Sequence, residues 1–166
     1  MNSESAAIKH LFISEQHNFV GHHGRDADEY STRDCSEVLC RSGSGIVGDR
    51  YFNHKPDYKG QITFFAWETF ERIRLMFPHV DLSSSVFRRN VITTGLDLNE
   101  LIGVEFEVQG IWFAGTEEAR PCYWMDRVIG DGAKSALEGF GGLRARILTD
   151  GTLKVGPCAL RTMSLL

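Results

Sequence analysis

The sequence lacks three features that would each assign it to a class: a long apolar run, a secretory leader and a metal-binding cysteine pattern. No window reaches ~18 consecutive apolar residues, so no membrane-spanning helix is predicted. The N-terminal residues show no basic region followed by an apolar run, so no secretory signal is expected. The four cysteines fit no zinc-site spacing and are too sparse for a disulfide framework. We therefore expect a cytoplasmic protein with reduced thiols.

An excess of positive charge is also absent. The formal net charge is −4 at pH 7, which gives no general attraction to nucleic acid or to an anionic membrane. An anion-binding site would therefore have to be a local cluster of arginines. The chain has 166 residues, 42% of them hydrophobic and 24% charged, which suffices for a packed core. We predict a single domain over residues 1–166.

The apolar pattern predicts a mainly β fold of the α+β class. Residues 60–65 are β-branched and aromatic, which is typical of a strand, and residues 66–77 place apolar groups on one side of a helix. Asp150-Gly151 is a strong hairpin signal, so residues 152–155 are expected to pair with the preceding strand. The other predicted strands are residues 6–12, 35–41, 86–94, 104–109, 111–114 and 144–149, with short helices at 123–128 and 133–140. Hairpin connections favour an antiparallel or mixed sheet that curls into a barrel or sandwich, with two or three short helices.

Residues 15–34 form a long polar stretch with little apolar pattern. Long loops inside a compact domain are often functional. His22 and His23 lie in this stretch, but neighbours in an extended chain point in opposite directions, and no further ligand follows at metal-site spacing. We expect a solvated loop over a pocket, with a metal site as the less favoured alternative.

Glycines at positions 43, 45 and 48 match the dinucleotide-binding pattern G-x-G-x-x-G. That pattern must open a helix, whereas the residues that follow here are poor helix formers and include Pro56. We therefore interpret the segment as a glycine-rich turn that presents Asp49 and Arg50. The arginine could bind a phosphate or carboxylate, or the two residues could form a surface ion pair.

Arg88, Arg89 and Asn90 stand at the entry to a predicted strand. A solvated sheet edge explains them, and so does an anion pocket that also includes Arg50. Because neighbouring side chains of a strand point to opposite faces, only one arginine should face such a pocket, and Arg89 is our choice.

Cys122 follows Arg120 and Pro121. Proline favours the first position of a helix, so Cys122 is expected in a first helical turn, where the unpaired N–H groups and the adjacent arginine favour a thiolate. The alternative is a small buried core residue. We predict that Cys122 is the reactive thiol, rather than Cys35, Cys40 or Cys158.

The run Gly45 to Arg50, GIVGDR, resembles the GxxGDR signature of MOSC domains, the C-terminal domains of molybdenum cofactor sulfurases. Further blocks resemble the family in the family's order, at residues 87–91, 101–103, 120–122, and 142–148 with Gly151. The resemblance covers residues 38–156 and implies a stand-alone MOSC domain with a β-rich, barrel-like fold.

The resemblance also implies a function for Cys122. The family cysteine carries sulfur as a persulfide or ligates the molybdenum of a pterin cofactor, so Cys122 would be both the catalytic residue and the metal ligand. The residues that would bind the molybdenum cofactor are Asp49, Arg50, Arg89, Asn90, Arg120 and Arg144. Several members are fused to a domain that uses pyridoxal phosphate; this chain has neither the length nor the lysine motif for it, so no pyridoxal phosphate is expected here.

Two classes of function remain open from the sequence. The first is a sulfur carrier or transferase, or a molybdenum-dependent reductase of small N-hydroxylated compounds, with a cysteine desulfurase or a molybdenum-cofactor enzyme as partner. The second is a non-catalytic module that binds an anionic ligand or partner through the arginines, with Cys122 as a structural thiol.

Overall fold

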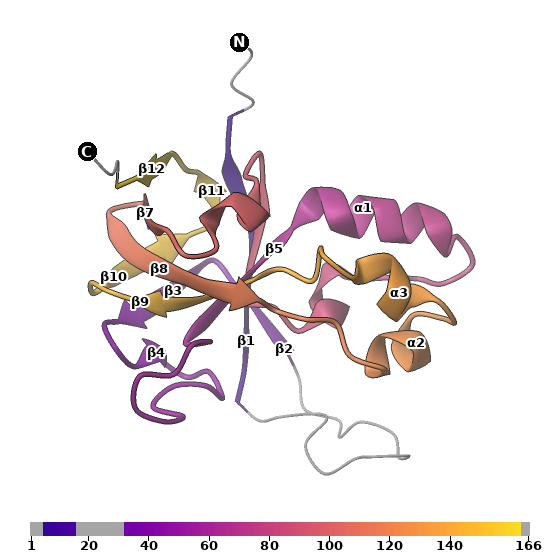
Figure 1. Ribbon diagram of the computed structural model, residues 1–166, viewed down its shortest axis with the longest axis horizontal. Helices are drawn as coiled ribbons and strands as arrows, with labels where there is room; N and C mark the ends of the chain where they lie inside the picture. Colours follow the sequence, from indigo (N-terminus) through magenta and orange to yellow (C-terminus); the bar gives the residue numbers. More distant parts are fainter. Residues whose placement is uncertain (1–4, 16–31, 164–166) are drawn as a thin grey trace.

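The computed structural model describes residues 5–15 and 32–163 (Figure 1). Within these residues, nine strands form a main sheet in the order β11-β1-β6-β5-β9-β8-β7-β12, with β2 paired to β1. They are β1 (Ala7–Ser14), β2 (Thr32–Cys35), β5 (Ile62–Ala66), β6 (Val91–Thr94), β7 (Glu105–Val108), β8 (Ile111–Glu118), β9 (Leu143–Ile147), β11 (Gly156–Pro157) and β12 (Leu160–Thr162). A second sheet has the order β10-β3-β4, with β3 (Glu37–Arg41), β4 (Gly45–Ile46) and β10 (Gly151–Lys154).

The helices lie together on one side of the molecule (Figure 1). They are α1 (Trp67–Met76), α2 (Trp124–Val128) and α3 (Ala133–Leu137). The 3-10 turn η1 (Ser84–Phe87) packs in their cluster, whereas η2 (Leu98–Leu101) packs in the cluster between the sheets. The predicted mainly β fold with short helices is confirmed. The sheet is mixed, because β5 and β6 pair in parallel while the other pairs are antiparallel. It is open, with β11 and β12 at its ends, so the expected barrel-like form holds only loosely.

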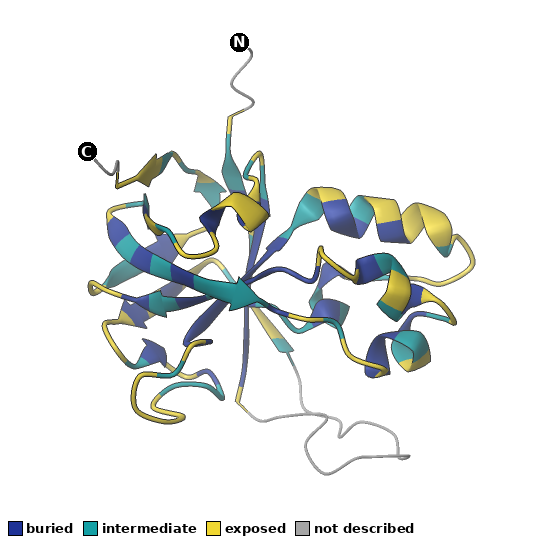
Figure 2. Ribbon diagram, viewed as in Figure 1, coloured by how far each residue is buried: buried dark blue, intermediate teal, exposed yellow. Residues whose placement is uncertain are grey.

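Strand β5 separates two hydrophobic clusters. Neighbouring side chains of a strand point to opposite faces. Phe64 accordingly packs against Phe106 and Phe113 in the cluster between the sheets, while Phe65 stacks on Phe87, with ring centroids 4.3 Å apart, in the cluster under the helices. Both faces of β5 are therefore covered (Figure 2), which explains why its sequence is apolar throughout.

Two sequence predictions about the strands are wrong. The strand after Asp150 does not pair back on β9; it crosses to the second sheet and pairs with β3. The Asp150 carboxylate accepts a bond from the Ser42 amide at 2.8 Å, which ties this turn to the second sheet, and Leu153 becomes fully buried there. The Asp150-Gly151 pattern predicts that the chain reverses there. The strand with which β10 pairs depends on residues distant in the sequence.

The predicted strand over residues 86–94 begins only at Val91. A 3-10 turn precedes it, because the Ser83 hydroxyl accepts a bond from the Ser85 amide and so caps the turn. Arg88 ends the turn in the left-handed region, with φ +60°. Helix α3 is also shorter than the predicted 133–140. In the part of the chain that the structure describes, no helix is long and apolar enough to cross a membrane.

Candidate functional site

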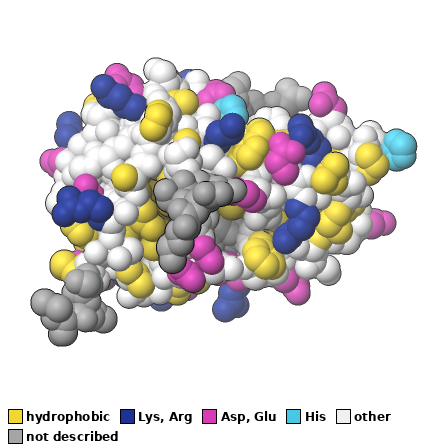
Figure 3. Space-filling view, turned by 90° about the horizontal axis from the view of Figure 1, so that it is seen from above, with side chains coloured by type: hydrophobic (Ala, Val, Ile, Leu, Met, Phe, Trp, Pro, Cys, Tyr) yellow, Lys and Arg dark blue, Asp and Glu magenta, His cyan; other side chains and the backbone are white. Residues whose placement is uncertain are grey.

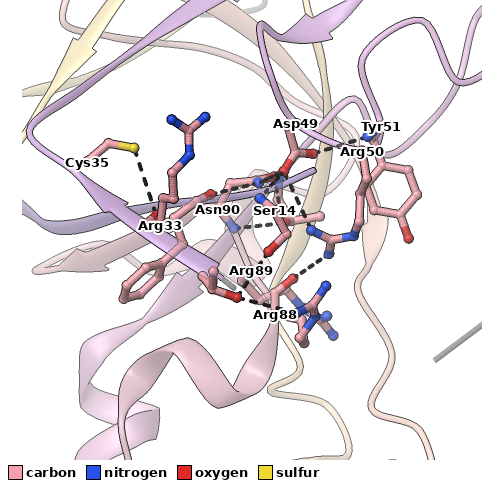
Figure 4. A network of polar contacts seen from close by, with 12 residues as sticks. Ser14, Arg33, Cys35, Asp49, Arg50, Tyr51, Arg88, Arg89 and Asn90 are labelled. Atoms are coloured by element: carbon pink, nitrogen blue, oxygen red, sulfur yellow. Dashed lines mark hydrogen bonds and ion pairs between the residues drawn. The ribbon is translucent and has the colours of Figure 1, made fainter. Parts of the chain in front are cut away.

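The glycine-rich turn holds Asp49 inside the protein. Gly45 has φ +130°, and a Cβ there would lie 3.2 Å from the Gln61 carbonyl oxygen, so the turn needs glycine. The Asp49 side chain is fully buried, and its two oxygens accept bonds from the amides of Ser14 at 3.1 Å and Tyr51 at 3.2 Å (Figure 4). Arg50 Nη1 lies 3.5 Å from Oδ1 of the same carboxylate. Asp49 thus fixes the turn and partly compensates the charge of Arg50.

Asn90 is the second buried polar anchor. Its Oδ1 accepts bonds from the Thr63 amide and hydroxyl, both at 3.0 Å, and its Nδ2 donates to the Phe12 carbonyl at 3.1 Å. Nδ2 also lies 3.4 Å from Asp49 Oδ1. These bonds join β1, β5 and the glycine-rich turn. The structure therefore brings Asp49 and Asn90 together, with their polar atoms used within the protein.

Arg88 and Arg89 follow a 3-10 turn, not a strand, and their side chains reach different neighbours. Arg88 Nη1 donates to the Thr32 hydroxyl at 3.3 Å, and the Arg88 carbonyl accepts a bond from Arg50 Nη2 at 3.2 Å. Both arginine residues are partly buried. The expectation that only Arg89 belongs to the site rested on strand geometry and is corrected: Arg88 adjoins Arg50.

Arg89 directs its guanidinium at three backbone carbonyls. Nε donates to Gly141 at 2.9 Å, Nη1 to Phe87 at 3.0 Å and Nη2 to Ala119 at 2.7 Å. Among the described residues, it forms no ion pair with a carboxylate. Ala119 lies three residues before Cys122, so Arg89 fastens the segment that leads to the cysteine.

Several charges act on Arg89 at once. Burial lowers the pKa of Arg89 to about 10, and repulsion from Arg144 and Arg50 acts in the same direction. The ionised forms of Tyr51 and Cys122 act in the opposite direction and favour the charged arginine. These side chains from distant parts of the sequence therefore lie within electrostatic reach of one another.

We call Arg50, Arg88, Arg89 and Arg144 the arginine cluster. Burial, reinforced by repulsion from Arg50, also lowers the pKa of Arg88 to about 10. In the described part of the chain, the cluster's carboxylate partners are Asp49 on Arg50 and Glu117, which lies 3.3 Å from Arg144 Nη1. Figure 3 shows basic and acidic side chains interspersed on the face seen from above, so that face carries no general basic surface. Positive charge is concentrated locally, where an anion would be attracted.

Sequence reasoning missed the tyrosines beside the cluster. The Arg50 guanidinium lies 4.8 Å from the centre of the Tyr51 ring, and Tyr51 stacks on Tyr58. Burial raises the pKa of Tyr58, and Tyr51 adds to that shift, whereas Arg144 and Arg50 oppose it. Tyr51 directly follows Asp49-Arg50 in the sequence, and this position could have identified it as a candidate site residue.

Cys122 lies before helix α2 and not within it. The helix begins at Trp124, so the predicted helix start at Pro121 is wrong, and the five-residue helix offers the thiol little dipole. The Cys122 carbonyl instead accepts a bond from the Met125 amide at 3.0 Å, which closes a turn. Cys122 is nevertheless the exposed cysteine of the four, since Cys40 is buried and Cys35 and Cys158 are partly buried. Burial raises the pKa of Cys40 to about 12 and raises that of Cys158.

Close backbone packing positions this segment. A Cβ on Gly141 would lie 2.2 Å from the Ala119 carbonyl oxygen and 2.9 Å from Pro121 Cδ. The Ala119 amide donates to the Gly142 carbonyl at 2.8 Å, and the Gly141 amide donates to the Glu118 carboxylate at 3.1 Å. Glycine at position 141 is therefore what allows the cysteine segment to approach.

The remaining predicted site residues differ in placement. Arg144 belongs to the arginine cluster, and Arg120 is exposed beside Cys122. His22, His23 and most of the predicted 15–34 loop lie outside the described residues. Within the described residues, no group of three or more histidine, cysteine and acidic side chains could hold a metal ion. Cys122 could supply one thiolate ligand to a metal that arrives with other ligands.

Comparison with known proteins relates this chain to one family and to several solved folds. The sequence model of the MOSC domain matches residues 22–157. The crystal structure of YuaD from Bacillus subtilis superimposes with a TM-score of 0.72 at 18% identity and covers 96% of this chain and 97% of that one. YiiM from Geobacillus stearothermophilus gives 0.67 at 13% identity, covering 96% and 75%, and YiiM from Escherichia coli gives 0.62 at 15%, covering 94% and 71%. At such identities the similarity shows a shared fold. No match was found among curated proteins.

Proposed function

Because this chain belongs to the MOSC domain family, as its sequence blocks indicated, we propose that it handles sulfur or a molybdenum-pterin cofactor through Cys122 while the arginine cluster binds the anionic part of the ligand. We propose that the protein acts in the cytoplasm, where thiols stay reduced and Cys122 would be a free thiol able to react.

One observation carries this proposal. Four arginines from three separate segments act electrostatically on one another: Arg50 donates to the Arg88 carbonyl, and Arg89 donates to the segment that leads to the exposed Cys122. Collecting like charges costs free energy, because burial and mutual repulsion both disfavour the charged forms. A bound anion would remove that cost, and guanidinium groups bind phosphate and similar anions through paired bonds.

In the sulfur-handling form, Cys122 would accept sulfur from a protein persulfide, such as that of a cysteine desulfurase. The Cys122 thiolate attacks the outer sulfur of the donor persulfide. A new sulfur–sulfur bond forms on Cys122, the donor's sulfur–sulfur bond breaks, and the donor cysteine leaves as a thiolate, which balances atoms and charge. Exposure of Cys122 gives a large protein donor access to the sulfur.

The residues also fit a molybdenum-pterin cofactor, judged by their chemistry. Cys122 would supply a soft thiolate ligand to the metal, and Arg50, Arg88 and Arg144 would hold the pterin phosphate. When bound, the molybdenum would supply two-electron redox chemistry. The chain's own contribution is to orient the cofactor, to neutralise its phosphate and to keep Cys122 at the edge of the arginine cluster.

Two measurements on protein purified from its own host test the proposal. Metal analysis and persulfide-specific labelling are compared between wild type and Cys122→Ser, with Cys158→Ser as the matched control. We expect molybdenum or sulfane sulfur in wild type and in Cys158→Ser, and loss of both in Cys122→Ser. If wild type carries neither molybdenum nor sulfane sulfur, and Cys122 does not react until the protein unfolds, the proposal fails. Phosphate calorimetry then tests whether the chain is an anion-binding module.

A further inference from the structure

We propose that Arg89 is a positioning residue: it holds the Ala119–Cys122 segment in place through its three carbonyl bonds, and the anion is contacted by other members of the arginine cluster. This inference rests on the proposed function and assigns separate roles within the site. It departs from the expectation that Arg89 itself binds the anion.

The geometry of the guanidinium supports this role. Each of its three nitrogens donates to a carbonyl, at 2.7 to 3.0 Å, and the three carbonyls belong to η1, to the segment after β8 and to the segment before β9. Only a planar fork with fixed N–H directions can join three such segments; an ammonium lacks that shape. Two of the three carbonyls, those of Ala119 and Gly141, belong to the closely packed pair that sets the path of the Cys122 segment.

The local environment favours carbonyls over a ligand as partners of Arg89. Among the described residues, the part-buried Arg89 guanidinium pairs with no carboxylate and donates to three backbone carbonyls, so any of these bonds given up to a ligand would leave a carbonyl unpaired. Arg144, by contrast, has a side chain 36% exposed, and its partner Glu117 is 45% exposed. An incoming anion can displace the Glu117 carboxylate at little cost, because exposed ion pairs contribute little.

The first test uses Arg89→Lys, with Arg146→Lys as the matched control. Arg146 also donates to a carbonyl, that of Asp57, but lies outside the cluster. Hydrogen exchange is followed at the amides of Ala119 and Gly141. We expect Arg89→Lys to exchange at least about tenfold faster at both amides, because each charge-assisted bond is worth about that factor in an opening equilibrium. Arg146→Lys should stay within about twofold of wild type. Equal exchange in Arg89→Lys and wild type would overturn the proposal.

A charge readout separates positioning from direct anion contact. The ratio of Cys122 alkylation rates with iodoacetate and with neutral iodoacetamide reports positive charge near the sulfur. Arg89→Lys keeps the charge, so the ratio should change less than about twofold, whereas Arg144→Gln should lower it while leaving amide exchange unchanged. If Arg144→Gln has no effect and Arg89→Lys lowers the ratio, Arg89 is the anion contact and the proposal fails.

Wild-type protein provides a measurement that needs no variant to fold. In nitrogen-15 spectra, the Arg89 Nε–H should exchange at least about tenfold more slowly than that of Arg144 and should shift less when phosphate or molybdate is added. A fast-exchanging Arg89 signal, or one that shifts most, refutes the positioning role. If no anion binds at all, the proposed function fails, while the exchange results still decide the role of Arg89.

Discussion

Replacing Asp49 by asparagine should destabilise this protein far more than the same change at a surface aspartate. The Asp49 side chain is fully buried, and Arg50, whose side chain is 8% exposed, lies 3.5 Å away. Removing one member of a buried ion pair costs about 3–5 kcal/mol, because the other charge stays buried without compensation. The distance between Arg50 and Asp49 is long for an ion pair, and Arg50 keeps its bond to the Arg88 carbonyl. We therefore expect a loss of unfolding free energy near the lower end of that range.

A second loss accompanies the first. The two carboxylate oxygens of Asp49 accept bonds from the amides of Ser14 and Tyr51. Asparagine offers only one oxygen, so one amide would face another donor, which costs about 1–3 kcal/mol. The two effects share atoms and do not add fully, so we expect about 4 kcal/mol in total. For a chain of this size that corresponds to a fall in Tm of roughly 8–16 °C.

The assay is thermal and urea unfolding of Asp49→Asn, with Asp57→Asn as control. Asp57 is 83% exposed and lies 2.9 Å from Arg146, so it also pairs with an arginine, and exposed pairs are worth about 0–1 kcal/mol. Added phosphate should restore more stability to Asp49→Asn than to wild type, because Arg50 loses its carboxylate partner. Equal, small shifts in Tm for both variants would refute the reasoning about Asp49 and its part in compensating the cluster.

Three further predictions concern single residues. Brief alkylation of native protein should label Cys122 first, whereas Cys40, whose pKa burial raises to about 12, should stay neutral and unlabelled from pH 6 to pH 9; peptide mapping that finds another cysteine labelled first would contradict this. Arg144→Gln should weaken phosphate binding by roughly ten- to a hundredfold in calorimetry with little change in Tm, and unchanged affinity would remove Arg144 from the site. Gly141→Ala should lower stability by about 1–3 kcal/mol in urea unfolding, because its Cβ would lie 2.2 Å from the Ala119 carbonyl oxygen, and a neutral result would show that the segment relaxes freely.

Some elements could be predicted because their causes are local. The apolar run of β5 and the one-sided pattern of α1 each predicted the correct element to within two residues at each end. The hairpin between β7 and β8 also formed as expected, through Gln109 and Gly110, both with positive φ. In each case neighbouring residues determine the backbone conformation, so the signal is contained in a short window.

The wrong prediction of strand pairing concerns a partner distant in sequence. Asp150-Gly151 turns the chain, but pairing with β3 is decided by contacts with Ser42 and by burial of Leu153. Likewise, the predicted strand at 86–90 is replaced by the end of the 3-10 turn Ser84–Phe87, after which Arg88 reaches Thr32 and Arg89 reaches Ala119. A window of sequence does not contain those neighbours.

The sequence by itself determined the family and the mainly β fold, and it supplied the candidate site residues: a cysteine, several arginines, Asp49 and Asn90. The family, the fold class and the candidate residues follow from residue types and their spacing, which can be seen in a single sequence. Only the tertiary structure decided their roles. Asp49 and Asn90 use their polar atoms within the protein, and Arg89 directs one N–H of each of its three nitrogens to a carbonyl. A hydrogen bond joins atoms according to their separation in space, and folding brings together residues that the sequence keeps apart.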